Sequence, residues 1–130
     1  MYFFRIRVKP VKRRRRKKSA LSRKHYGLHK ENTRILILSR LGHFNLFYKF
    51  KWKKVFIKNV KSRWGSCSKR GNLNFNYKLG LISPHLLDYV VAHELCHLGE
   101  FNHSQKFWSL VKQTIPDYRK RRIELRKIRI

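Results

Sequence analysis

The feature that most limits how this chain can fold is His93-Glu94-Leu95-Cys96-His97, set inside a strongly apolar segment. Ser83-Pro84 is a typical helix start, with serine as the cap and proline at the first helical position. Gly99 is a typical stop. Between them the apolar residues follow helical spacing: Leu86, Leu87, Val90, Val91, Leu95 and Leu98. The sequence therefore predicts a buried helix that presents both histidines on one face.

Two imidazoles four residues apart on a helix can bind one metal ion, and His103 follows after the chain has room to turn back. A catalytic zinc site takes three protein ligands and keeps one open position. Glu94, one position further round the helix, reaches a metal-bound water but not the metal, as a general base does. We expect His93, His97 and His103 to bind Zn²⁺, with Glu94 as the catalytic base. The same three ligands would also accept cobalt or nickel.

Other residues compete for supporting roles. Glu100 is an alternative ligand if the helix continues past Gly99, and otherwise supports a histidine ring from outside. Asp88 and Asp117 are further candidates for such support. The spacing equals that of metzincins, but their methionine turn is excluded because the chain has one Met, Met1. The candidates to stabilise a tetrahedral oxyanion are Tyr77, Tyr89, His85 and Arg63.

The charge of the chain is extreme: 34 Lys and Arg oppose six Asp and Glu, giving +28. Such an imbalance predicts non-specific association with nucleic acid through basic segments, above all the run Lys12–Lys18. No module that reads bases is visible. Two cysteines, Cys67 and Cys96, favour small buried thiols in a reducing compartment. Neither a secretory signal nor a membrane span is recognised, which predicts a cytoplasmic protein without a membrane partner.

The remaining pattern predicts an α+β fold. Strands are expected at 2–9, 54–59 and 63–68, and the last of these forms a hairpin with 72–77 around Gly71. A helix is expected over 31–48 with Ile35, Leu38, Leu41 and Phe44 facing the core, and a strand at 36–37 is its competitor. Two helices follow, at 104–115 and 117–129. The strand at 72–77 is expected to have a wet asparagine face and to be the sheet edge, to which a peptide could add.

The stretch from Lys54 to Leu125 resembles the YgjP-like metal-dependent hydrolases, which are related to the SprT-like metallopeptidases. The residues that carry the resemblance are Lys61-Ser62-Arg63-Trp64-Gly65-Ser66-Cys67-Ser68, Gly71-Asn72-Leu73-Asn74-Phe75-Asn76, the motif at 93–97, Asn102-His103-Ser104 and Pro116-Asp117-Tyr118. Residues 1–30 differ from family members, which carry a longer β-rich region there. The chain is therefore divided into a basic N-terminal arm with a short strand, 1–30, and a YgjP-like zinc hydrolase domain, 31–130.

The resemblance implies a compact zincin-like core: a small antiparallel sheet, the metal-binding helix and following packed helices. It also implies zinc at the three histidines and Glu94 as base. Two classes of reaction stay open, hydrolysis of a peptide bond and hydrolysis of a nucleoside triphosphate. A third hypothesis is a nucleic-acid-binding protein with a structural zinc and no activity. We rank the peptidase first. The nucleotide hydrolase ranks lower because no glycine-rich phosphate cradle is visible and carboxylates for Mg²⁺ are few. The structural zinc ranks lower because three ligands with a spare glutamate suit an open site.

Overall fold

The computed structural model describes residues 2–4 and 18–130 of the chain. The elements are β1 (Tyr2–Phe4), α1 (Ala20–Tyr48), β2 (Val55–Lys58), β3 (Gly65–Cys67), β4 (Leu73–Asn76), a 3₁₀ helix η1 (Tyr77–Leu81), α2 (Pro84–Cys96), α3 (Gln105–Thr114) and α4 (Tyr118–Arg126). This is the predicted α+β fold. The basic run predicted as an arm lies outside the described residues except for Lys18, and the division of the chain at residue 30 stays a prediction.

The sheet has the strand order β1-β3-β4-β2. β3 and β4 form the predicted antiparallel hairpin, and Gly71 closes its turn with a φ of 88°, which glycine adopts without a Cβ clash. β2 pairs with β4 in parallel, so the expectation of a purely antiparallel sheet is wrong. The reason is that β4 inserts between β2 and β3. β4 runs antiparallel to β3, which precedes it in the chain, and therefore runs in the same direction as β2, its other neighbour in the sheet.

The strand β4 is central, so the expectation that it offers a free edge to a peptide is also wrong. All four of its residues are buried, including the asparagines that were expected to face water. Their amides are satisfied inside the protein: Nδ2 of Asn74 donates to the Ser66 hydroxyl at 3.1 Å, and Nδ2 of Asn76 donates to the Val60 carbonyl at 2.7 Å. Buried asparagines of this kind fix the path of the loop between β2 and β3.

The first long helix, α1, starts earlier than predicted and passes residue 30 without a break. Ser19 caps it by accepting from the Ser22 amide at 3.1 Å. The helix excludes the alternative strand, but its buried face is not the expected one. Leu41 and Phe44 are buried as predicted, together with Thr33 and Ile37, whereas the predicted Ile35 and Leu38 are 65% and 43% exposed. The helix therefore carries two apolar stripes, and packing selects one of them.

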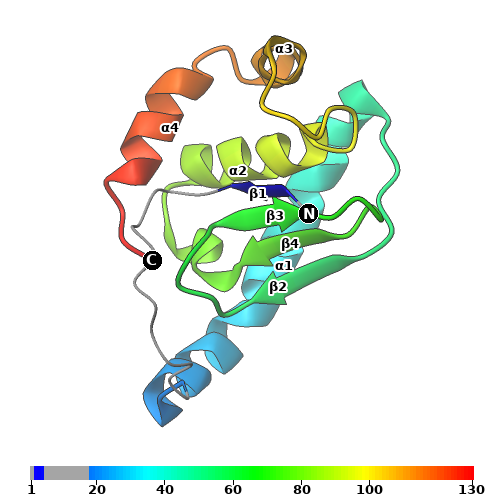
Figure 1. Cartoon of the computed structure of the whole chain (residues 1–130). Coiled ribbons are helices and arrows are strands. Elements are labelled where there is room, and N and C mark those ends of the chain that lie inside the picture. The colour runs from blue at the N-terminus through cyan, green and yellow to red at the C-terminus, as the bar shows by residue number, and fades with distance from the viewer. Residues whose placement is uncertain (1, 5–17) are drawn as a thin grey trace.

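In Figure 1, α1 crosses behind the sheet while α2 runs along the β1 side of it, and α3 and α4 lie beyond α2. α2 supplies much of the core, with ten of its thirteen residues buried. It ends at Cys96, three residues before Gly99, so His97 is its C-cap. Ser104 caps α3 by accepting from the Phe107 amide, so of the two possible caps in the sequence, Asn102 and Ser104, the second is used. No described helix has the length and apolar character to cross a membrane.

Candidate metal centre

Three histidine rings converge at the C-terminal end of α2. His93 and His97 come from the helix and its cap, and His103 comes from the loop that leads to α3. Nε2 of His93 lies 3.1 Å from Nε2 of His97 and 3.0 Å from Nε2 of His103. The candidate ligand atoms all lie within 4.8 Å of one another. Three ring nitrogens aimed at one point need protons or a cation between them, so the cluster fits a metal ion with nitrogen ligands.

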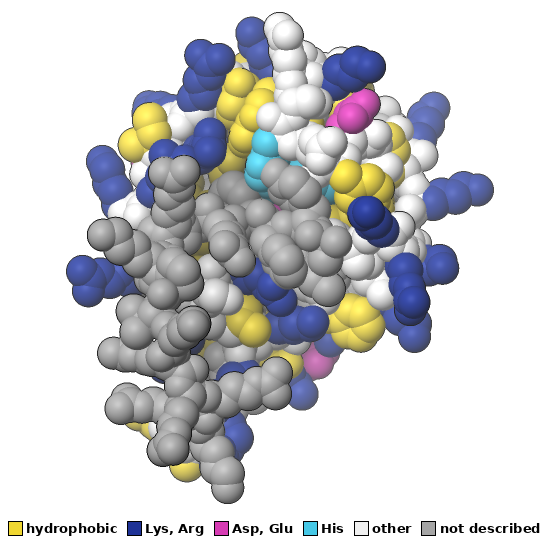
Figure 2. Space-filling view, in the orientation of Figure 1, with side chains coloured by type: hydrophobic (Ala, Val, Ile, Leu, Met, Phe, Trp, Pro, Cys, Tyr) yellow, Lys and Arg dark blue, Asp and Glu magenta, His cyan; other side chains and the backbone are white. Residues whose placement is uncertain are grey.

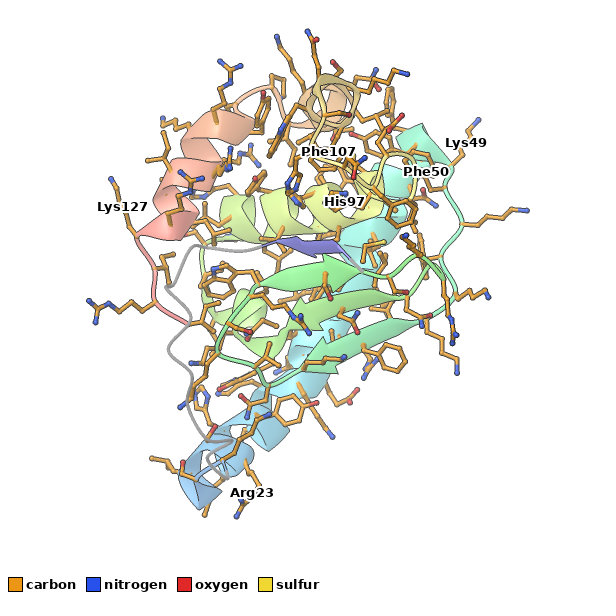
Figure 3. All side chains as sticks on the ribbon, in the orientation of Figure 1. Arg23, Lys49, Phe50, His97, Phe107 and Lys127 are labelled. Carbon is orange, nitrogen blue, oxygen red and sulfur yellow. The ribbon has the colours of Figure 1, made fainter. Side chains whose placement is uncertain are left out.

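The rings are held in place by groups around them. Nδ1 of His97 lies 2.9 Å from the Glu100 carbonyl, which accepts its proton and leaves the Nε2 lone pair for a metal. The His97 ring also stacks on Phe107, with centroids 4.2 Å apart and an interplanar angle of 11° (Figure 3). Glu100 therefore supports His97 through its backbone. Its carboxylate is not in the group of described side chains that could hold a metal, so the alternative prediction that Glu100 is a ligand is not supported.

The other two rings are positioned in similar ways. The hydroxyl of Tyr89, one turn before His93 on α2, lies 3.4 Å from Nδ1 of that ring. The ring of His103 stacks on Trp108, with centroids 5.3 Å apart at 21°. His93 and His97 are fully buried, whereas His103 is exposed. The centre therefore reaches the surface at His103, and Figure 2 shows histidine side chains at the surface beside hydrophobic ones.

Desolvation of the ring nitrogens, complete at His93 and His97 and partial at the exposed His103, favours the neutral form of the imidazoles, which is the form that binds a metal. Desolvation lowers the pKa of His93 well below its ordinary value, and lowers the pKa values of His97 and His103 to about 4. The guanidinium of Arg122, on α4, adds to the lowering of the pKa at His93 and His103. The three rings therefore stay unprotonated near neutral pH and leave their nitrogen lone pairs available to a metal cation.

Glu94 is fully buried beside this cluster. Among the described residues neither of its carboxylate oxygens has a hydrogen-bond partner. Desolvation raises its pKa well above the ordinary value, and the charge of Arg63 partly opposes this rise. Burying a carboxyl group without hydrogen-bond partners costs folding free energy, so such a group points to a function that requires it. Its position and its elevated pKa suit a group that accepts and returns a proton.

The strand β3 closes over Glu94 at Gly65. A methyl group built on Gly65 would lie 3.0 Å from Cγ and 3.1 Å from Oε1 of Glu94, and 3.1 Å from the carbonyl oxygen of Asn74. A methyl group at this position therefore requires Glu94 and the Asn74 carbonyl to move by a few tenths of an ångström. The sequence singles out Gly65 only through the family resemblance. Its close approach to Glu94 is a contact between a strand and a helix, which no local pattern reveals.

Several residues singled out in the sequence lie in other interactions. The Tyr77 hydroxyl lies 2.8 Å from Nδ1 of His25, and Nε2 of His85 lies 2.7 Å from the Glu124 carboxylate. The carboxylates of Asp88 and Asp117 pair with Arg40 and Arg121, at 2.7 Å and 3.1 Å. Of the four oxyanion candidates, Tyr89 and Arg63 are the two beside the centre.

The cysteines are buried free thiols, as expected. Burial raises the pKa values of Cys67 and Cys96 to about 12, so both thiols are protonated and neither is a nucleophile or a metal ligand in this state. Sequence reasoning missed Arg122, whose guanidinium carbon lies 5.1 Å from the centroid of the Trp108 ring. It reaches the centre only because α4 folds back towards α2.

A buried glutamate next to three converging imidazoles, on an α+β frame, is the arrangement expected of a metal-dependent hydrolase. The model of one family, described as YgjP-like, metallopeptidase domain, matches residues 4–128. The chain belongs to this YgjP-like family of metallopeptidase domains. The match begins at residue 4, so it includes the N-terminal residues that were expected to differ from the family.

Two solved structures share the fold. The metallopeptidase zymogen abylysin of Pyrococcus abyssi has a TM-score of 0.58 and 24% identity, over 68% of this chain and 87% of the other. The metallopeptidase zymogen jannalysin of Methanocaldococcus jannaschii has a TM-score of 0.55 and 24% identity, over 73% of this chain and 92% of the other. No curated protein matches the sequence significantly.

Proposed function

We propose that the protein is a zinc-dependent peptidase in which His93, His97 and His103 hold the metal and Glu94 is the general base. The observation that carries this proposal is the buried carboxyl group of Glu94, without a partner in the described structure, beside three neutral imidazoles that converge on one point. A zinc ion bound there would supply Lewis acidity and lower the pKa of a coordinated water towards ~7.

The residues of the chain then have separate tasks. An oxygen of the Glu94 carboxylate takes a proton from the attacking water and returns it to the leaving amine of the substrate. Burial raises the pKa of Glu94, which favours the protonated state that the second half of the reaction needs. β3 keeps the carboxyl group in place through Gly65. Arg63 and Tyr89 stay the two candidates to stabilise the oxyanion, because the charge of Arg63 acts on Glu94 and the Tyr89 hydroxyl lies 3.4 Å from Nδ1 of His93.

The proposal includes non-specific association with nucleic acid. No Asp or Glu occurs between Glu31 and Asp88, a stretch that includes β2, β3 and β4. On the edge strand β2, the exposed ring of Phe56 has Nζ of Lys58 5.8 Å from its centroid. In the described part of the face shown in Figure 2, Lys and Arg side chains project at many places, while Asp and Glu appear only in isolated places. Basic groups beside an exposed aromatic ring suit a single-stranded nucleic acid.

The test is cleavage of an unfolded protein by the zinc-loaded enzyme, with and without single-stranded DNA. Glu94→Gln should abolish cleavage and retain zinc, while the matched Glu31→Gln change, at an exposed site on α1, should have no effect. DNA should stimulate cleavage, and salt should suppress the stimulation. Zinc-loaded wild type that leaves unfolded protein intact but hydrolyses nucleoside triphosphates would replace the peptidase with a nucleotide hydrolase. Equal activity of Glu94→Gln and wild type would refute the role of Glu94.

A further inference from the structure

One face of α1 is apolar and has no partner in the described structure. Seven of the ten large hydrophobic residues that are exposed in this part of the chain lie on that one helix. Four of them, Leu21, Leu28, Ile35 and Leu46, lie on the side opposite the buried stripe, with the uncharged Asn32, Ser39 and Gly42 between Leu28 and Leu46. We call this set the outer face of α1: Leu21, Leu28, Asn32, Ile35, Ser39, Gly42 and Leu46.

The outer face is unusual for this protein because it has no net charge. The chain has 34 Lys and Arg among 130 residues, yet none of the seven positions is basic. The charged residues on the same side of the helix are Lys24 and Glu31, which have opposite signs. Ile35 is 65% exposed, Leu28 is 66% exposed and Leu46 is 78% exposed. Several exposed large apolar side chains on one side of a helix mark an interaction site rather than ordinary surface.

The sizes of the side chains change along the outer face. The N-terminal half carries large residues, Leu21 and Leu28, whereas the C-terminal half contains the small Ser39 and Gly42. Gly42 is exposed in mid-helix, where glycine is unfavourable, and a methyl group built there would have no neighbour within 4 Å among the described residues outside its own helical turn. Packing within the described part of the chain therefore does not account for this glycine. A close approach by a second helix would explain it.

We propose that the protein forms a homodimer by antiparallel pairing of the outer faces of α1. A two-fold axis between Asn32 and Ile35 places Leu28 of each copy opposite Ser39 of the other, so large residues fill the space over small ones. The end residues Leu21 and Leu46 then meet. An interface of this kind is self-complementary, as two-fold symmetry requires. This inference is independent of the proposed peptidase activity.

The dimensions and the charges are compatible with such a dimer. A helix of 29 residues is about 43 Å long and about 10 Å wide, so the pair buries on the order of 1,000 Å² in total, the lower end for a specific interface. Two chains of +28 repel each other, and salt screens that repulsion beyond a Debye length of ~10 Å at 0.1 M. Association through an apolar face should therefore strengthen as salt rises.

Other occupants of the outer face are less suitable. Residues 5–17 of the chain are mostly Lys and Arg, which have no counterpart on an uncharged apolar strip. Nucleic acid needs positive charge, which this face lacks, and its binding weakens with salt. The sign of the salt dependence therefore separates a protein dimer from aggregates held together by nucleic acid.

The experiment is sedimentation velocity on nuclease-treated protein, at ~0.1 M and ~1 M salt. We expect the dimer fraction to rise with salt. Ile35→Lys should be monomeric at both concentrations, and Ile123→Lys, which changes an exposed isoleucine on α4, should dimerise like wild type. Circular dichroism and retained metal uptake show that Ile35→Lys is folded. A wild-type monomer throughout, or association that weakens with salt, would overturn the proposal. Binding of monomers to anionic vesicles that Ile35→Lys abolishes would assign the face to a membrane surface and overturn it as well.

Cysteine cross-linking tests the antiparallel arrangement. The native Cys67 and Cys96 are buried, so introduced surface thiols dominate the reaction. Leu28→Cys mixed with Ser39→Cys should give a disulfide-linked dimer under mild oxidation, whereas each variant alone should give little. Efficient linking of Ser39→Cys to itself would indicate parallel helices and would refute the proposed pairing.

Discussion

Replacing Gly65 by alanine tests whether the position of Glu94 controls catalysis. The added methyl group would lie 3.0 Å from Cγ and 3.1 Å from Oε1 of Glu94, and 3.1 Å from the Asn74 carbonyl oxygen. Both neighbours must move by a few tenths of an ångström. Overpacking at a buried site costs about 1–3 kcal/mol, which corresponds to a fall in Tm of roughly 3–10 °C for a chain of this length. A shifted base should lower kcat by about 10- to 100-fold.

The matched control is Gly80→Ala. Its methyl group would lie 2.3 Å from Oγ1 of Thr33, a residue of α1 whose hydroxyl donates to the Tyr77 carbonyl at 2.6 Å. This change should lower Tm at least as much as Gly65→Ala without moving Glu94. The assay is kcat and zinc content, measured well below the Tm of each variant. If Gly65→Ala keeps full activity, or if both variants lose kcat in proportion to their loss of stability, the reasoning about Glu94 is refuted.

Three further predictions concern protons and metal. In metal-free protein, the pKa of buried Glu94 is raised above 4.5, so the folded state holds a proton that the unfolded chain releases, and stability falls as pH rises from about 4.5. Glu94→Gln should therefore have a higher Tm than wild type, by a margin that grows with pH, and a constant margin would contradict this. Because the pKa values of His97 and His103 are lowered to about 4, zinc binding to the Glu94→Gln variant should release almost no protons at pH 5.5, as calorimetry in two buffers would measure. Release of two or more protons would mean that the rings titrate normally. Tyr89→Phe removes the hydroxyl 3.4 Å from Nδ1 of His93 and should weaken zinc about 10-fold in a competition assay with a chelator; unchanged affinity would remove Tyr89 from the support of the ligand.

Local patterns in the sequence predict much of the candidate site. The four-residue spacing of His93 and His97 places them on one helical face because helix geometry is local. The cap at Ser104 and the turn at Gly71 are local for the same reason, since each satisfies a backbone requirement within a few residues. His103 joins the other two imidazoles because the short loop after α2 limits how far it can move from them.

Other features depend on contacts between distant segments. The parallel pairing of β2 with β4 and the burial of Asn74 and Asn76 arise because β4 inserts between strands that precede it in the chain. No local pattern shows that Gly65 touches Glu94, because that contact joins a strand to a helix about thirty residues later in the sequence.

Which face of α1 is buried also depends on contacts between distant segments. Its sequence contains two apolar stripes at helical spacing, and either could have faced the core. The packing of η1, α2 and β2 covers the stripe of Thr33, Ile37, Leu41 and Phe44 and leaves Ile35 exposed. The sequence by itself predicted that a helix with the HExxH motif would form, and which residues are the candidates for the metal and the base. Only the tertiary structure decided which apolar face is buried and which glycine holds the base, because burial is a property of the neighbours that the fold brings together.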